Sequence, residues 1–133
     1  MLLIPAALRA RLAANAVRAA ADDRFDPPPL LKLFNPMGAA TWLATEIGAD
    51  DDTLFGLADL GFDCPELGYF SLSEIAAVRL PLGLRIERDR AFATRVPLSR
   101  WAETARAHGS ILAAEIVLRR GAAPELPPGS PDG

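Results

Sequence analysis

The sequence predicts an α+β fold, with a mainly antiparallel sheet of four to five short strands. An N-terminal helix and a helix near residues 98–108 are expected to pack on one face of this sheet. The chain has 133 residues, 50% of them hydrophobic and 23% charged, as expected of one globular domain. Short apolar stretches alternate with turn-forming residues in its middle, and amphipathic helical patterns lie toward both ends. We therefore expect a single α+β domain over residues 1–120 and a flexible Pro/Gly-rich tail over residues 121–133.

The first element is a helix predicted over residues 5–21. Leu8, Leu12 and Ala16 fall on one face at 100° per residue, whereas the arginines flank or oppose that face. Asn15 lies near the apolar face, where an unpaired amide would be costly. We therefore expect the Asn15 side chain to bond a neighbouring loop.

Four short strands are expected in the middle of the chain. Each is rich in residues that favour a pleated strand and is bounded by Gly, Pro, Asn or Asp. The second stretch also fits a short helix because alanine is frequent there, but its Thr, Trp and Ile residues favour a strand. The four predicted strands are residues 30–34, 39–47, 53–60 and 67–70.

Two further elements follow these strands. Ser71 and Glu74 have the spacing of a capping box, which predicts a short helix that ends near Arg79. Residues 84–89 alternate between apolar and charged side chains, which predicts a fifth strand.

The last two elements lie before the tail. Residues 98–108 have the periodicity of an amphipathic helix, and Gly109 is suited to end it. Residues 111–118 are apolar enough for either a strand or a helix, and the pattern does not decide between them.

The inventory of reactive residues disfavours most catalytic chemistry. Cys64 is the only cysteine, so an intramolecular disulfide and a cysteine-rich zinc site are excluded. Its neighbour Asp63 should raise the pKa of the thiol, which disfavours a nucleophile. His108 is the only histidine, and no nucleophile elbow or glycine-rich phosphate loop accompanies it. We therefore predict no catalytic residue, no metal site and no cofactor.

The apolar stretches are too short for a membrane protein. None approaches the ~20 residues of a spanning helix. The apolar start of the chain lacks the basic region of a secretory signal and is soon broken by Arg9 and Arg11. We therefore expect a cytoplasmic protein without a membrane partner.

The charges are divided along the chain. Residues 33–78 contain eight acids and no Lys or Arg, whereas residues 79–106 contain seven arginines and three acids. If these segments occupy different faces, the molecule is dipolar and its field steers charged partners. The alternative is that they pair across the fold as ordinary surface ion pairs. We assign partner binding to six of the acids: Asp50, Asp51, Asp52, Asp59, Asp63 and Glu66.

A metal-dependent enzyme is the alternative use of these acids. Clustered carboxylates bind Mg²⁺ or Mn²⁺, and Asp59 and Glu66 flank a turn where they could converge. The arginines of residues 79–106 would then hold the phosphates of single-stranded DNA or another nucleic acid. The net charge of −3 argues against such a partner.

Three stretches together resemble a known bacterial family. They are LKLFNP (31–36) leading into ATWL (40–43), FGLADLG (55–61), and PELGY (65–69) with the following SL (71–72). Over roughly residues 1–108 the chain resembles the bacterial domains of unknown function catalogued as number 2958. The resemblance implies a cytosolic protein associated with plasmids and other mobile elements. It implies no activity and no catalytic residues.

The sequence therefore favours a non-catalytic interaction module of a bacterial mobile element, whose acidic surface binds a protein partner. An anti-defence protein, either anti-restriction or anti-CRISPR, would be one form of such a module. Nucleic acid bound through residues 79–106 and self-association through an exposed strand edge are the other two partner classes considered.

Overall fold

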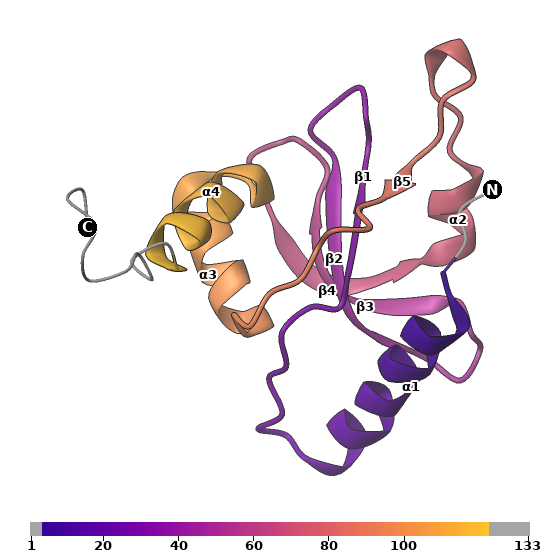
Figure 1. Ribbon diagram of the computed structural model, residues 1–133, viewed down its shortest axis with the longest axis vertical. Helices are drawn as coiled ribbons and strands as arrows, with labels where there is room; N and C mark the ends of the chain where they lie inside the picture. Colours follow the sequence, from indigo (N-terminus) through magenta and orange to yellow (C-terminus); the bar gives the residue numbers. More distant parts are fainter. Residues whose placement is uncertain (1–3, 123–133) are drawn as a thin grey trace, which may run out of the picture.

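The computed structural model describes residues 4–122, in which helices lie at both ends of a group of strands (Figure 1). The order of the elements along the chain confirms the predicted α+β class. The elements are α1 (Ala6–Ala21), β1 (Leu31–Phe34), β2 (Thr41–Ile47), β3 (Thr53–Asp59), β4 (Glu66–Ser71), α2 (Leu72–Ala77), the 3₁₀ turn η1 (Pro81–Gly83), β5 (Glu87–Arg88), α3 (Leu98–His108) and α4 (Ile111–Ala122).

The strands form one antiparallel sheet in the order β4-β3-β2-β1-β5. The first four strands follow one another as a meander, because short turns of Gly, Pro, Asn and Asp join them. β5 returns to pair with β1, where Arg88 lies opposite Leu33. β4 and β5 are therefore the two edge strands, and β5 is only two residues long.

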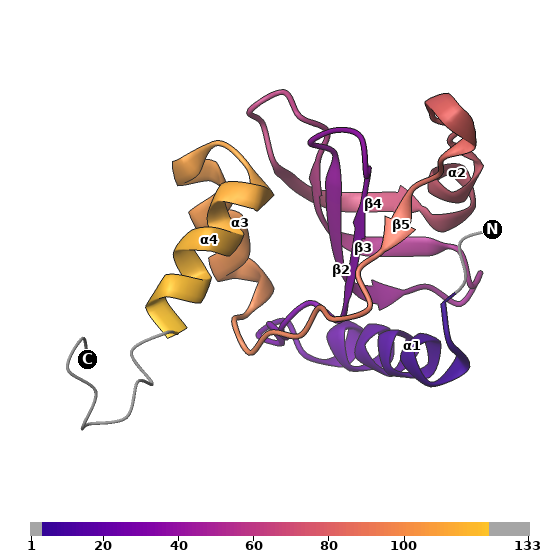
Figure 2. The ribbon, with the colours of Figure 1, turned by 45° about the horizontal axis from the view of Figure 1, so that its top comes forward.

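The helices cover both faces of the sheet, so the prediction that they pack on one face is wrong. α1 and α2 share a core with Trp42 and Ala44 of β2, whereas α3 and α4 share a second core with Leu43 of the same strand. Successive side chains of a strand point to opposite faces, so an apolar central strand needs a helical layer on each side. Figure 2 shows α1 and the α3–α4 pair on different sides of the strands.

A bulge in β2 changes which side chains share a face. The register with β3 shifts between Ala44 and Glu46, so Ile47 joins the α1 core rather than the face of Leu43. Asn15 of α1 donates from Nδ2 to the carbonyl oxygen of Thr45 at 2.9 Å. The predicted partner of Asn15 was a loop, and the partner found is the backbone of this bulge.

The structure decides between strand and helix for residues 111–118, which the sequence left open. Residues 111–118 lie within helix α4, whose partner α3 ends at Gly109 with φ of 86°. α4 ends at Ala122, two residues inside the expected tail, and residues 123–133 lie outside the described residues. The predicted strand 84–89 shortens to β5, because only Glu87 and Arg88 reach β1.

Candidate functional site

The acids between β2 and β3 are used to build their own loop. Asp50 accepts hydrogen bonds from the amides of Asp52 and Thr53 and from the Thr53 hydroxyl. Asp52 accepts from the Ser71 hydroxyl and from the Ser73 amide, both at 2.7 Å. These contacts fix the start of α2, where Ser71 also accepts from the Glu74 amide as the capping-box spacing predicts.

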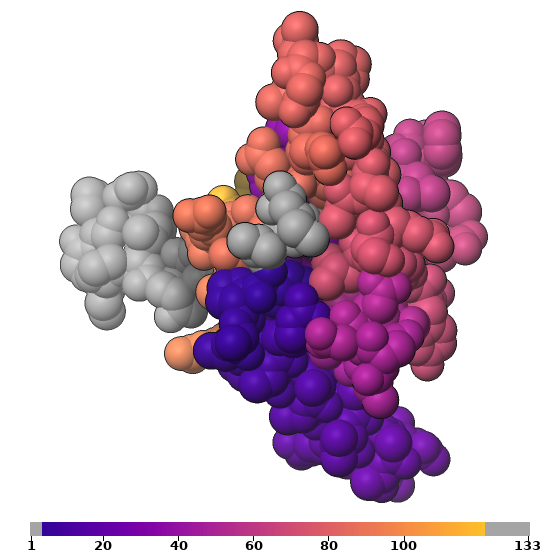
Figure 3. Space-filling view, turned by 90° about the vertical axis from the view of Figure 1, so that its right-hand side faces the viewer, coloured from indigo at the N-terminus to yellow at the C-terminus, as the bar shows by residue number. Residues whose placement is uncertain are grey.

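Asp51, the third acid of this loop, is held by α1. Its carboxylate lies 2.6 Å from Nη1 of Arg9, and the same Nη1 also donates to the carbonyl oxygen of Asp51. Figure 3 shows the loop near residue 50 lying against the indigo helix α1. Asp50, Asp51 and Asp52 are therefore engaged in contacts within the protein.

The bonds to Asp52 predict a pH-dependent stability. The Ser71 hydroxyl and, after it, the Ser73 amide lower the pKa of Asp52. A carboxyl whose pKa is lower in the folded state contributes stability above its unfolded pKa, near pH 4, and loses that contribution as pH falls through the folded pKa. Asp52→Asn should therefore destabilise the protein at neutral pH, and the difference from wild type should shrink as pH falls below about 4.

Urea denaturation at several pH values measures this effect. The control is Asp23→Asn, because Asp23 is exposed and makes no side-chain hydrogen bond within residues 4–122. The control should match wild type at every pH. A stability difference for Asp52→Asn that stays constant from neutral to acid pH would contradict the prediction.

Asp59 is fully buried and serves the fold. Its Oδ1 accepts from the Gly61 amide and its Oδ2 from the Ile111 amide, each at 2.9 Å. Glu66 is exposed and accepts a 3.3 Å contact from the Cys64 thiol instead. The structure therefore does not bring Asp59 and Glu66 together as a metal-binding pair. Within residues 4–122 no three His, Cys, Asp or Glu side chains are grouped as metal ligands.

Asp63 and Glu66 lie beside an open hollow near the β3–β4 turn. Cys64, Leu67 and Arg106 of α3 line the same hollow. The hydrogen bond to Glu66 and the charge of Glu66 raise the pKa of the Cys64 thiol, although Arg106 acts in the opposite direction. This direction agrees with the prediction, but Glu66 rather than Asp63 is its main source. Cys64 itself is exposed.

Large apolar side chains are exposed around β4 and the turn before it. Phe62 is 80% exposed and Tyr69 is 76% exposed, and Leu60 and Leu67 are also exposed. Tyr69 packs on Phe55 of β3 with ring centroids 5.0 Å apart. We call Leu60, Phe62, Leu67 and Tyr69 the edge patch. Leu67 and Tyr69 are alternate residues of β4 and so lie on the same face of the strand, and neighbouring exposed apolar side chains mark an interaction surface more often than single ones do.

The backbone of β4 is also open along its outer edge. The Leu72 amide donates to the Asp52 carbonyl oxygen at 2.9 Å, which fixes which residues of β4 bond to β3. Because bonding alternates along an antiparallel pair, the amides and carbonyls of Leu67 and Tyr69 point away from β3. No other strand of residues 4–122 pairs with this edge. The same two residues thus present both free backbone groups and exposed side chains.

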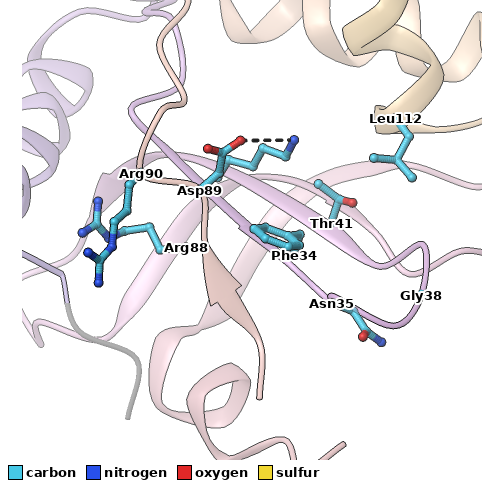
Figure 4. Close-up of a pocket in the computed structure, with 9 residues that line it drawn as sticks. Phe34, Asn35, Gly38, Thr41, Arg88, Asp89, Arg90 and Leu112 are labelled. Atoms are coloured by element: carbon cyan, nitrogen blue, oxygen red, sulfur yellow. Dashed lines mark ion pairs between the residues drawn. The ribbon is translucent and has the colours of Figure 1, made fainter. Parts of the chain in front are cut away.

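A second polar site lies between β1, β5 and α4. Lys32 is buried, and its Nζ lies 2.8 Å from Glu115 of α4. It also lies 3.6 Å from Asp89, the ion pair that the dashed line marks in Figure 4. A buried lysine is costly unless it is paired in this way. A lysine on an otherwise apolar strand is the signal in the sequence that indicates a buried partner, and Lys32 was not among the predicted site residues.

The arginines of residues 79–106 form no close ion pair with the acids of residues 33–78 among the described residues. Among residues 4–122, none of the seven arginines at positions 79–106 forms an ion pair, and Asp51 is the only acid of residues 33–78 that does. The expected alternative of pairing across the fold is therefore not what the described residues show. Arg85 donates to the Ala76 carbonyl oxygen, which orders the segment after α2.

Residues 3–112 match the family model described as "Protein of unknown function (DUF2958)". The chain belongs to the DUF2958 family. No curated protein and no solved structure matches it. No helix within residues 4–122 has the length and apolar character needed to cross a bilayer.

The DUF2958 match covers most of the sites described above. It includes the edge patch, Lys32 and the arginine-rich segment. It ends at Leu112, near the start of α4, so Glu115, which pairs with Lys32, lies just beyond it. The family description assigns no activity.

Proposed function

We propose that this DUF2958 protein is a non-catalytic interaction module that adds a strand of a protein partner to the free edge of β4. The observation that supports this is the coincidence, at Leu67 and Tyr69, of free backbone groups and exposed apolar side chains. In strand addition the backbone bonds supply affinity, and pockets for alternate side chains supply specificity.

The usual protection of an edge strand is missing from β4. Natural edge strands are blunted by lysines, prolines or bulges that prevent pairing with other chains. β4 contains none of these, and Glu66 at its first position is its only charged residue. Full burial of an exposed large apolar side chain contributes about 1.5–3 kcal/mol, so each partly covered member of the edge patch would contribute at most this amount to binding, before the costs of association are subtracted.

Two of the six predicted acids lie beside the edge patch. Asp63 and Glu66 border the edge patch, whereas the other four are bonded within the protein or buried. With Arg106 at the same hollow, the local excess is one negative charge. The expected partner is therefore an extended segment with apolar side chains and a basic residue near the β3–β4 turn. An anti-defence role on a mobile element is a narrower form of this proposal, in which that partner is a restriction or CRISPR protein.

Two substitutions of Tyr69 test whether a partner strand binds at the free edge of β4. Tyr69→Lys should abolish capture of the partner from a bacterial host extract, because a lysine on an edge strand opposes pairing. Tyr69→Phe should retain it, because it keeps the ring that packs on Phe55. With the purified partner, hydrogen exchange at the Leu67 and Tyr69 amides should slow on binding, since only strand addition engages these outward-facing groups.

Two results would contradict the proposed strand addition to a protein partner. A partner that binds Tyr69→Lys as well as wild type, or that leaves exchange at Leu67 and Tyr69 unchanged, would refute strand addition. If light scattering shows a dimer of the purified chain that Tyr69→Lys dissociates, the edge serves self-association and the proposed partner is wrong.

A further inference from the structure

Three arginines from distant parts of the chain line one hollow. Arg11 comes from α1, Arg88 is the last residue of β5, and Arg90 lies two residues after it. The hollow has a volume of about 300 Å³ and lies between α1 and the segment that follows β5. We call it the arginine hollow. Its size is at the lower end of small-ligand sites.

The fold places Arg88 and Arg90 together. Arg88 pairs with Leu33 of β1, and the Asp89 amide donates to the Lys32 carbonyl oxygen at 3.0 Å, so this segment is held on the sheet. Figure 4 shows the Arg88 and Arg90 side chains directed to the same side, while Asp89 points toward the lysine with which it pairs. Both arginines also line the pocket drawn there.

The positive charge of the hollow is not balanced from within. Asp89 is the only acid that lines it, and Asp89 pairs with Lys32 rather than with an arginine. Arg11, Arg88 and Arg90 form no ion pair within residues 4–122. The first turn of α1, which contributes Ala7 to the lining, contains no acidic residue. Arginines that line one hollow without an acidic partner give it a positive potential that favours a bound anion.

The rest of the lining is apolar. Leu8, Leu30, Leu31 and Phe92 form it, so the hollow combines a cationic side with an apolar one. Guanidinium groups match phosphate oxygens in pairs of hydrogen bonds, which makes arginine the preferred phosphate-binding side chain. A concave lining with a few converging polar groups is the usual form of a small-molecule site.

We propose that the arginine hollow binds the phosphate group of a small organic phosphate, such as a mononucleotide. The three arginines would hold the phosphate, and the organic part would lie against the leucines and Phe92. The isoelectric point of about 5.1 and the net charge of −3 disfavour a long nucleic acid as the ligand, because such binding depends on broad positive surface. This inference is independent of the β4 edge.

Calorimetric titration with AMP at low salt tests the proposal. Wild-type protein should bind AMP, and the double substitution Arg88→Gln with Arg90→Gln should weaken binding about tenfold or more, the loss of at least one charge-assisted pair. Arg100→Gln is the matched control, because Arg100 is exposed on α3 and lines none of the hollows that Arg88 and Arg90 line. The control should bind AMP as wild type does, and urea denaturation should show all variants folded.

Two further ligands distinguish the sources of phosphate. Inorganic phosphate should bind more weakly than AMP if the apolar lining contributes. Absence of AMP binding to wild type, or equal binding by wild type and the double variant, would overturn the proposal. A single-stranded oligonucleotide that binds more tightly than AMP and depends on Arg88 and Arg90 would also overturn it, because the hollow would then contact a nucleic-acid backbone.

Discussion

Replacement of Gly56 by alanine should unfold or severely destabilise the protein. An added Cβ would lie 1.7 Å from the Leu43 carbonyl oxygen and 2.8 Å from the Ala44 Cα. Both atoms belong to the backbone of β2, which is packed between helical layers on both faces and cannot move away. We expect a loss of more than about 3 kcal/mol in the free energy of unfolding, a large share of the stability of a small domain.

Gly68→Ala is the matched control for this prediction. Gly68 lies directly opposite Gly56 across the β3–β4 pair, but an added Cβ there would meet no atom within 4 Å. We expect its free energy of unfolding to stay within about 1 kcal/mol of wild type, since alanine restricts the unfolded chain more than glycine does. Urea denaturation followed by circular dichroism measures both. Equal losses for the two variants would show that the close approach of β2 is not what requires Gly56.

Elements set by local chemistry were predicted well from the sequence. The helix predicted over residues 5–21 is α1, and the helix predicted over residues 98–108 matches α3 and ends at Gly109 as expected. The Ser71–Glu74 spacing identified the start of α2. In each case the deciding interactions lie within one turn of the chain, so periodicity and capping residues are sufficient evidence.

The sequence could not predict how elements that are distant along the chain pack against one another. Alternation in β2 indicated two faces, but it could not reveal that separate helical layers cover both of them or that a bulge moves Ile47 to the other face. The choice of helix for residues 111–118 likewise depends on packing against α3 and the sheet. These outcomes depend on contacts between distant residues, which a short window does not contain.

Four of the six acids predicted to bind a partner make contacts within the protein, and the physical reason can be stated. The acids were selected by their number in a segment without basic residues, yet aspartates beside turns and helix starts bond nearby amides and hydroxyls. Asp50 and Asp52 do this locally, and Asp59 does it over 52 residues of sequence. The pairing of Lys32 with Glu115 spans 83 residues, so only the lysine could have been singled out beforehand.

The second large effect is expected at Asp59, which joins the end of β3 to the start of α4. Asp59→Ala would leave the buried Ile111 amide and the Gly61 amide without their acceptor. The unsatisfied buried Ile111 donor costs about 1–3 kcal/mol and the Gly61 donor, which lies nearer to solvent, costs less. The carboxylate charge near the first turn of α4 would also be lost. We expect Asp59→Ala to reduce the free energy of unfolding by about 2–4 kcal/mol, measured by urea denaturation.

Asp59→Asn separates the hydrogen bonds from the charge. Asparagine retains one acceptor oxygen, so it can keep one of the two amide bonds and should cost less than alanine. Hydrogen exchange locates the effect, because the Ile111 amide should lose protection in Asp59→Ala while amides in the β1–β2 pair should lose less. Equal stability for the alanine variant and wild type would show that α4 holds its position without this bond. Packing of Ile111 and Ala114 against α3 and the sheet would then be what holds α4 in place, and Asp59 would not be required for it.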